Sequence, residues 1–246
     1  MPNPYFRFKQ FTVYHNRCAM KVTTDSCLFG AWAAHEISNS KLDSSGQKIR
    51  KVLDVGTGTG LLSLMVAQSN EVEIEAVEID NEASQQAKEN VQASPWPNRI
   101  QIFNEDILSF HPEKKYDCII SNPPFYENEL ASETSKKNIA HHSEQLTIAE
   151  VLKFIQTCLN KDGLFFLMYP FKRKKEVDEM FRENDLHVVN TMLLSQSIKH
   201  QPFRVIIKGS NKKTGKEEPV SISIWDENEQ YTQAFTNLLK DYYLYL

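Results

Sequence analysis

Cysteine is scarce in this sequence of 246 residues, and its four cysteines have no paired short spacing and no histidine partners at zinc-ligand intervals. No apolar run approaches the roughly eighteen residues of a membrane span, and the N-terminus lacks the apolar core of a signal peptide. We therefore expect a cytoplasmic protein without membrane contact, and a monomer. We also expect neither a disulfide nor a bound metal, and reduced, mostly buried thiols at Cys18, Cys27, Cys118 and Cys158.

The sequence has no excess of positive charge, since its 28 Lys and Arg residues are outnumbered by 32 Asp and Glu residues, for a net charge of −4. This balance argues against broad, sequence-independent coating of nucleic acid, which requires many cations on phosphates. Any one cluster of cations is more typical of a solvated surface. Several clusters flanking a cleft would instead favour an RNA groove. Basic residues cluster within 7–21, 136–142, 172–175, 199–208 and 212–216.

Strands and helices alternate along most of the chain, which is typical of a parallel sheet, and no internal repeat or low-complexity segment interrupts them. A Ser/Lys/Gly-rich linker over 38–47 suggests a boundary. We therefore expect an N-terminal extension over 1–47 that packs on one catalytic domain over 48–246. The expected strands are 6–13, one near 52, 73–77, 99–103, 116–120, 164–169, an antiparallel pair at 187–194 and 203–208, and an edge strand or arm at 220–225. The expected helices are 24–36, 61–68, 82–93, 147–159, 172–184 and 229–243.

A glycine-rich turn follows the strand near residue 52. The segment Asp54-Val55-Gly56-Thr57-Gly58-Thr59-Gly60 spaces its glycines as G-x-G-x-G, whereas dinucleotide sites have G-x-G-x-x-G, and no Lys-Ser/Thr follows as a phosphate loop requires. Phosphate binding is therefore disfavoured. Glycines still allow a ligand to approach the backbone closely at the tip of the strand, where open α/β sheets bind ligands. A nucleoside-type cofactor fits that crevice.

Acidic residues end the next two strands. Glu78 lies about twenty residues after the glycines, where an acid can accept hydrogen bonds from both ribose hydroxyls. Asp106 follows the third strand, and its carboxylate could accept from the amino group of an adenine in the cofactor. Each acid alone is more often a solvated charge. Three strand tips in series favour a cofactor site.

A rigid loop rich in acceptors follows the apolar segment 116–120. In Asn122-Pro123-Pro124-Phe125 the two prolines fix φ near about −65° and remove two N–H groups, which leaves carbonyls and the Asn122 amide as acceptors. Phe125 is well placed to stack on a flat heterocycle, worth roughly 1–3 kcal/mol per base. Taken alone, the segment is equally well explained as a turn. Together with the strand tips upstream, it predicts a site for an exocyclic amino group on a planar substrate.

These motifs carry a resemblance to a known family. The glycine loop and the Asn-Pro-Pro-Phe motif are similar in order and spacing to those of the class I S-adenosylmethionine-dependent methyltransferases. The resemblance covers nearly the whole chain, and the stretch after about Lys208 carries little motif. The aromatic residues from Tyr231 to Tyr245 are more typical of a packing stripe than of a base-stacking surface. Further segments resemble the bacterial tRNA1(Val) adenine-37 N6-methyltransferases: Phe8-Lys9-Gln10-Phe11, His15 to Asp25, Ala140-His141-His142, Leu146-Thr147 and Lys172-Arg173-Lys174.

The resemblance implies a Rossmann-like, doubly wound α/β fold with a mostly parallel seven-stranded sheet and an antiparallel final strand. It implies S-adenosyl-L-methionine as cofactor, the anticodon loop of tRNA as partner, and methyl transfer to N6 of adenine 37. Implied catalytic residues are Asn122, Pro123, Pro124 and Phe125. Implied cofactor-binding residues are Asp54, Gly56, Thr57, Gly58, Gly60, Glu78, Ile79, Asp106, Ile107 and Asn122. Implied substrate-binding residues are Phe125, Tyr126, Lys21, Arg17, His141, Lys172 and Arg173.

Two alternatives stay open. Similar Asn-Pro-Pro-aromatic loops occur in methyltransferases that act on rRNA guanine N2, DNA adenine N6 or protein glutamine. Glutamine enzymes usually carry a helical substrate domain and DNA enzymes a separate target-recognition region, so the short leader of this chain favours RNA. The other alternative is a non-catalytic module that binds S-adenosylmethionine or RNA, although degenerate sites usually lose their strand-end residues.

Overall fold

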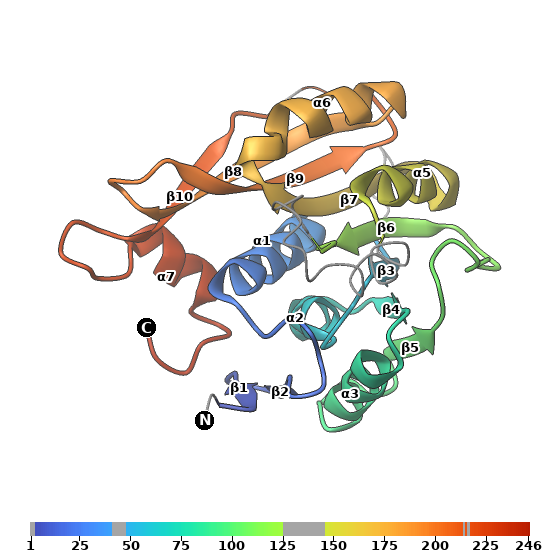
Figure 1. Ribbon diagram of the computed structural model, residues 1–246, viewed down its shortest axis with the longest axis horizontal. Coiled ribbons are helices and arrows are strands. Elements are labelled where there is room, and N and C mark those ends of the chain that lie inside the picture. The colour runs from blue at the N-terminus through green and yellow to red at the C-terminus, as the bar shows by residue number, and fades with distance from the viewer. Residues whose placement is uncertain (1–2, 41–47, 125–145, 214, 216) are drawn as a thin grey trace, which may run out of the picture.

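An eight-stranded sheet forms the centre of the molecule in the computed structural model, which describes residues 3–40, 48–124, 146–213, 215 and 217–246. The strand order is β10-β8-β9-β7-β6-β3-β4-β5 (Figure 1). Neighbouring strands run parallel except at β9, which is antiparallel to both β7 and β8. The strands are β3 (Lys51–Val55), β4 (Glu73–Glu78), β5 (Ile100–Asn104), β6 (Tyr116–Ser121), β7 (Leu159–Pro170), β8 (His187–Ser197), β9 (Pro202–Ser210) and β10 (Val220–Trp225).

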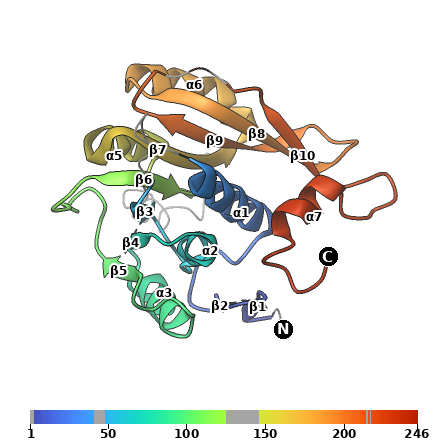
Figure 2. The same ribbon diagram turned by 180° about the vertical axis from the view of Figure 1, so that it is seen from behind.

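Helices pack on both faces of this sheet (Figure 2). One hydrophobic cluster joins α1, α2 and α7 to one face, and a second joins α5 and α6 to the other. Successive strand residues alternate between them, since Ile120 belongs to the first cluster and Ile119 to the second. Burial on both faces explains the continuous apolar runs of the central strands. The helices are α1 (Thr24–Asn39), α2 (Leu61–Ser69), α3 (Asn81–Gln92), α5 (Ile148–Cys158), α6 (Lys174–Glu183), α7 (Gln233–Leu239) and a 3₁₀ turn, η1 (Phe171–Arg173).

The predicted fold class is confirmed, including the antiparallel pairing of β8 with β9. The sheet nevertheless has one strand more than expected. β10 lies at its edge and pairs parallel with β8. Ile222 and Ile224 are buried in the first cluster, so the segment that could have been an arm joins the sheet instead.

The leader, defined as residues 3–23, forms a short hairpin. Its strands β1 (Tyr5–Arg7) and β2 (Thr12–Tyr14) are antiparallel. Between them the Phe8 N–H donates to the Phe11 carbonyl at 2.9 Å, so the single strand predicted over 6–13 is interrupted by a turn. Both rings are buried in the first cluster. The domain division at residue 47 stays a prediction, because residues 41–47 lie outside the described ranges.

The terminal helix α7 is shorter than the helix predicted over 229–243. The Thr232 hydroxyl caps it by accepting from the Phe235 N–H at 3.2 Å. The Thr232 N–H donates to the Ile224 carbonyl at 3.0 Å. The residues before the helix therefore pair with β10 instead of extending α7.

The two ends of the chain lie side by side. The Lys9 N–H donates to the Tyr242 carbonyl at 2.8 Å, and Phe8 forms a β-bridge with Tyr243. Phe235, Tyr242 and Tyr243 are buried, which confirms the expected packing role of these aromatic residues. Tyr245 differs, because it is 88% exposed.

Among the described residues, none of the helices has both the length and the apolar character to cross a membrane. The same residues contain no group of three or more His, Cys, Asp or Glu side chains that could hold a metal ion. All four cysteines are free thiols, of which Cys27, Cys118 and Cys158 are buried. Burial, with a smaller contribution from Glu78 and Asp80, raises the pKa of the Cys18 thiol to about 11.

Candidate active site

The carboxyl ends of β6, β3, β4 and β5 meet at one edge of the sheet, which we call the carboxyl edge. Val55 of β3 pairs with Val77 of β4 and with Ser121 of β6. Glu78 pairs with Asn104 at the end of β5. The residues that follow these pairs therefore emerge next to one another, at the edge where open α/β sheets bind ligands.

The glycine loop leaves β3 at this edge in a conformation that only glycine adopts without strain. Gly56, Gly58 and Gly60 have φ angles of 68°, 56° and 81°. A Cβ atom built on Gly56 or Gly58 would meet no described atom within 4 Å. The glycines are thus required by the backbone conformation, and the space beside the loop is open on the side of the described residues.

Asp54 is fully buried beneath the loop. Its Oδ2 accepts hydrogen bonds from the Thr57 hydroxyl at 2.6 Å and from the Ser63 hydroxyl and N–H at 2.7 and 3.2 Å. Burial raises the pKa of Asp54 to about 6, although these hydrogen bonds act in the opposite direction. Its Oδ1 has no partner among the described residues. Asp54 therefore joins the loop to the first turn of α2, and Ser63 is a contributor that sequence reasoning did not identify.

Glu78 ties the glycine loop to the end of β4. Its Oε2 accepts from the Gly58 N–H at 2.8 Å and its Oε1 from the Asp80 N–H at 3.0 Å. Burial raises the pKa of Glu78, and these backbone donors oppose that rise. Each carboxylate oxygen has a further lone pair, so the side chain can accept hydrogen bonds from a ligand while it holds the loop.

The end of β5 completes this side of the site. The Asn104 amide, which sequence reasoning missed, donates to the Glu78 and Ile79 carbonyls at 2.9 and 3.0 Å. Ile79 is 50% exposed and offers an apolar surface beside Glu78. Asp106 accepts from the Leu108 N–H at 2.9 Å. Ile107, by contrast, is buried in the second hydrophobic cluster, so its side chain packs against the core.

Asn122 and the two prolines leave β6 on the other side of the glycine loop. The Ser121 hydroxyl donates to the Val55 carbonyl at 2.9 Å and so fixes the end of β6 against β3. The next side chain carries a buried oxygen, Asn122 Oδ1, that has no hydrogen-bond partner among the described residues. A buried acceptor without a donor is costly, and a ligand N–H would relieve that cost. The predicted residues Phe125, Tyr126 and His141 lie outside the described residues.

The remaining predicted substrate residues are dispersed. Lys21 is exposed in the leader, and Lys172 is exposed just beyond the end of β7. Arg17 forms an ion pair with Glu89 of α3. Arg173 forms a bidentate pair with Glu176 of α6, at 2.6 and 2.9 Å. Each of these arginines thus already has an acidic partner from the chain itself.

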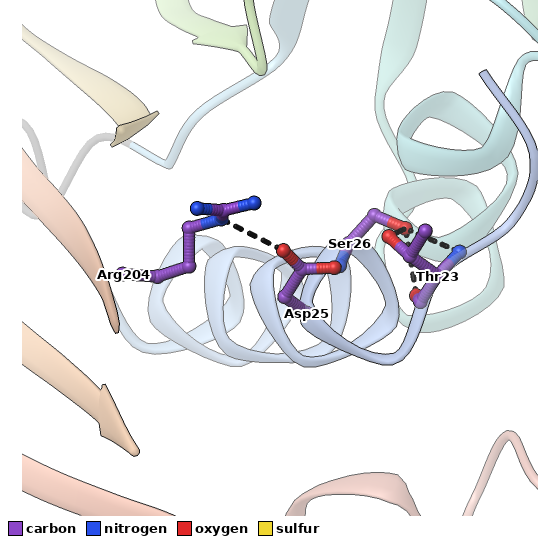
Figure 3. Close-up of polar contacts among 4 residues, drawn as sticks. All are labelled: Thr23, Asp25, Ser26 and Arg204. Carbon is purple, nitrogen blue, oxygen red and sulfur yellow. Dashed lines mark hydrogen bonds and ion pairs between the residues drawn. The ribbon is translucent and has the colours of Figure 1, made fainter. Parts of the chain in front are cut away.

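A pairing that the sequence did not predict connects the start of α1 to β9 (Figure 3). The Arg204 Nε donates to the Asp25 Oδ2 at 2.8 Å. A capping box between Thr23 and Ser26 fixes the first turn of α1, in which Asp25 lies. Because Arg204 pairs with Pro170 at the end of β7, this contact also lies at the carboxyl edge.

Comparison with known proteins identifies the class first. The family model described as methyltransferase small domain matches residues 22–167, which is more than half of the chain, so the protein belongs to that family. A predicted O-methyltransferase from Agrobacterium tumefaciens has a similar fold, with a TM-score of 0.67, 11% identity, and coverage of 88% of this chain and 95% of its own. A putative RNA methyltransferase from Pyrococcus horikoshii gives a TM-score of 0.58 at 17% identity, with coverage of 83% and 93%.

Relatives that match over nearly their full length then identify the particular family of methyltransferases. The tRNA1(Val) (adenine(37)-N6)-methyltransferase of Parabacteroides distasonis is 36% identical over 99% of both chains. The protein of the same name from Pectobacterium carotovorum is 39% identical over 98% of this chain and 94% of its own. The chain belongs to the tRNA1(Val) (adenine(37)-N6)-methyltransferase family.

Proposed function

We propose that this protein transfers a methyl group from S-adenosyl-L-methionine to N6 of adenine 37 in the anticodon loop of tRNA1(Val). The observation that carries the proposal is the buried Asn122 Oδ1 at the end of β6, beside the glycine loop, which has no hydrogen-bond partner among the described residues. It is an acceptor, and the amino group of adenine is a donor. The relatives named above support the choice of substrate.

The residues of the carboxyl edge fit the proposed cofactor. S-adenosylmethionine supplies an electrophilic methyl on a positively charged sulfur. No described atom fills the space beside Gly56 and Gly58, which would admit it, and the acids near the glycine loop match its charge. Glu78 would accept from the ribose hydroxyls, Ile79 would cover one face of the adenine, and Asp106 would accept from its amino group. Asp54 would act through the loop that it holds.

The Asn122 loop would position the target amino group. This nitrogen is conjugated with the adenine ring and is a poor nucleophile, so orientation matters more than a general base. If the Asn122 side-chain oxygen and the Pro123 carbonyl accept hydrogen bonds from its two N–H groups, the lone pair of the nitrogen turns toward the methyl group of S-adenosylmethionine. Holding both reactants in this way can lower a barrier by as much as about 7–11 kcal/mol. Pro123 and Pro124 would limit the movement of the loop, and Phe125 would stack on the base.

The remaining expectations belong to the same proposal. The substrate contacts would include Lys21 and Lys172, and the domain over 48–246 would carry the catalytic residues with the extension over 1–47 packed against it. A tRNA substrate is consistent with a cytoplasmic location.

Methyl transfer measured on a panel of substrates tests the proposal. The purified protein and labelled S-adenosylmethionine should methylate a tRNA1(Val) transcript, and digestion should release N6-methyladenosine. A transcript with guanosine at position 37 is the matched control and should receive no label. Preferential labelling of ribosomal RNA, DNA or a release factor would contradict the proposal.

A further inference from the structure

The turn between β8 and β9 also projects from the carboxyl edge, and β7 lies between it and β6 in the sheet. Pro170 at the end of β7 pairs with Arg204 near the start of β9, and β8 ends at Ser197. Residues 198–201 join the two strands, and all four are exposed. The turn is orange in Figure 1, where it lies above the loop that joins β10 to α7.

Hydrogen bonds hold this turn in one conformation. The Ser197 hydroxyl accepts from the Lys199 N–H at 3.2 Å and lies 2.7 Å from the His200 Nδ1. The Ile198 N–H donates to the carbonyl of Trp225, the last residue of β10, at 3.1 Å. These contacts use backbone groups, the Ser197 hydroxyl and the His200 imidazole. They leave the Lys199 ammonium exposed, with no ion-pair partner among the residues that the structure describes.

The segments that form the turn and the end of β7 contain no acids. The chain has 32 Asp and Glu residues, yet none occurs between Leu186 and Lys216 or between Gly163 and Lys175. The two segments meet at the carboxyl edge, because η1 packs against β9. Asp25 of α1 and Glu176 of α6 also lie on this side, and each is paired with an arginine, Asp25 with Arg204 and Glu176 with Arg173.

Two acidic regions lie on either side of the surface formed by the β8–β9 turn and the end of β7. On one side lie Glu78, Asp80 and Asp106 at the ends of β4 and β5. On the other side, beyond β10, the turn 226–230 carries Asp226, Glu227 and Glu229. A polyanion that reaches Asn122 would avoid both and would pass over the ends of β7, β9 and β8.

We propose that the β8–β9 turn, with Lys199 as its main cation, binds the sugar-phosphate backbone of the tRNA. This inference rests on the proposed function. From the strand registers, and with about 3.3 Å per residue and 4.8 Å per strand, the turn lies roughly 25 Å from the Asn122 loop. At about 3.4 Å per base step, that distance corresponds to roughly seven steps, so the contact falls on the anticodon stem, away from the methylated base.

A pair of charge reversals tests this surface. Lys213 is also an exposed lysine of the acid-free segment, but it follows the other end of β9 and so lies at the opposite edge of the sheet. Binding of the tRNA1(Val) anticodon stem-loop, followed by fluorescence anisotropy at several salt concentrations, should weaken about tenfold in Lys199→Glu. The slope of log affinity against log salt should decrease by about one to two. Lys213→Glu should change the affinity by less than about twofold.

The outcomes separate this inference from the function on which it rests. Both variants should bind S-adenosylmethionine as the wild type does, which shows that neither substitution disturbs the fold. If the wild type neither binds nor methylates the stem-loop, the proposed function and this inference fail together. If the wild type does both, and Lys199→Glu binds no more weakly than Lys213→Glu, only this inference is overturned.

Discussion

The acids and the lysines of the carboxyl edge differ in how far they are exposed. At the ends of β3, β4 and β5, the acids accept hydrogen bonds from the protein itself, as Asp54 does from Ser63 and Glu78 from Gly58. Beyond β7 and β8, Lys172 and Lys199 are exposed. We call these the acidic half and the basic half of the edge. A prebuilt acidic half suits a small cation bound in one orientation, and an exposed basic half suits a large polyanion.

Asn122 lies between the two halves, and its loss should have the largest effect. Asn122→Ala removes the proposed acceptor for the target amino group. We expect turnover to fall by about 10²–10³-fold or more, the usual cost of removing one oriented polar group from an active site. Single-turnover methylation of tRNA1(Val) would measure this. Affinities for S-adenosylmethionine and for the stem-loop should stay near the wild-type values, and full activity in the variant would refute the proposed role of Asn122.

Asp54 should make the acidic half sensitive to pH. Burial raises its pKa from the ordinary 3.8 to about 6, so the folded protein holds this proton more tightly than the unfolded chain does. The free energy of unfolding should therefore fall as the pH rises from about 4 to about 6, by at most roughly 3 kcal/mol from this group.

Asp54→Asn isolates that contribution, because all other titrating groups are common to both proteins. Urea unfolding of both proteins at about pH 4 and about pH 7 should show that the wild type loses more stability than the variant between the two conditions. An equal loss in both would show that burial of Asp54 does not oppose its ionisation.

Glu78 should affect the cofactor and leave the RNA unaffected. Glu78→Ala removes a charged acceptor, whose hydrogen bonds are worth about 1.5–3 kcal/mol, so the Kd for S-adenosylmethionine should rise about 10- to 100-fold. Calorimetric titration measures this. Glu82→Ala is a matched control, since Glu82 is an exposed acid in the first turn of α3. A similar rise in both variants would indicate a general effect of charge and would argue against a contact by Glu78.

The acidic half could be predicted well because its signals are local. The spacing of the glycines, the acid Glu78 and the alternation of strands and helices can each be read from a short window of sequence. In the structure the glycine loop follows the end of β3, and Glu78 is the last residue of β4. Asp54 is fully buried and accepts hydrogen bonds from Thr57 and Ser63, and its place among the cofactor-binding residues stays a prediction. Ser63 and Asn104 could not be predicted, because a hydroxyl in a helix and an amide at the end of a strand have no distinctive spacing.

The basic half was harder to predict because its contacts join distant segments. Asp25 and Arg204 are 179 positions apart, and no periodic pattern relates them. Clusters of lysines were visible in the sequence, but their surroundings were not. Lys208, counted within one cluster, forms an ion pair with Glu36 at 2.8 Å and is only 9% exposed, whereas Lys199 of the same cluster is exposed. The topology of β8 and β9 places these two lysines at opposite edges.

The contact between the two ends of the chain has a consequence for folding. Joining Lys9 to Tyr242 closes a loop of more than 230 residues, at an entropic cost of roughly 5 kcal/mol on the logarithmic scale of loop closure. Such a contact forms only after most of the sheet exists to bring its partners together. The start of the leader, around Phe8 and Lys9, is therefore expected to dock late, and its position depends on the final residues of the chain.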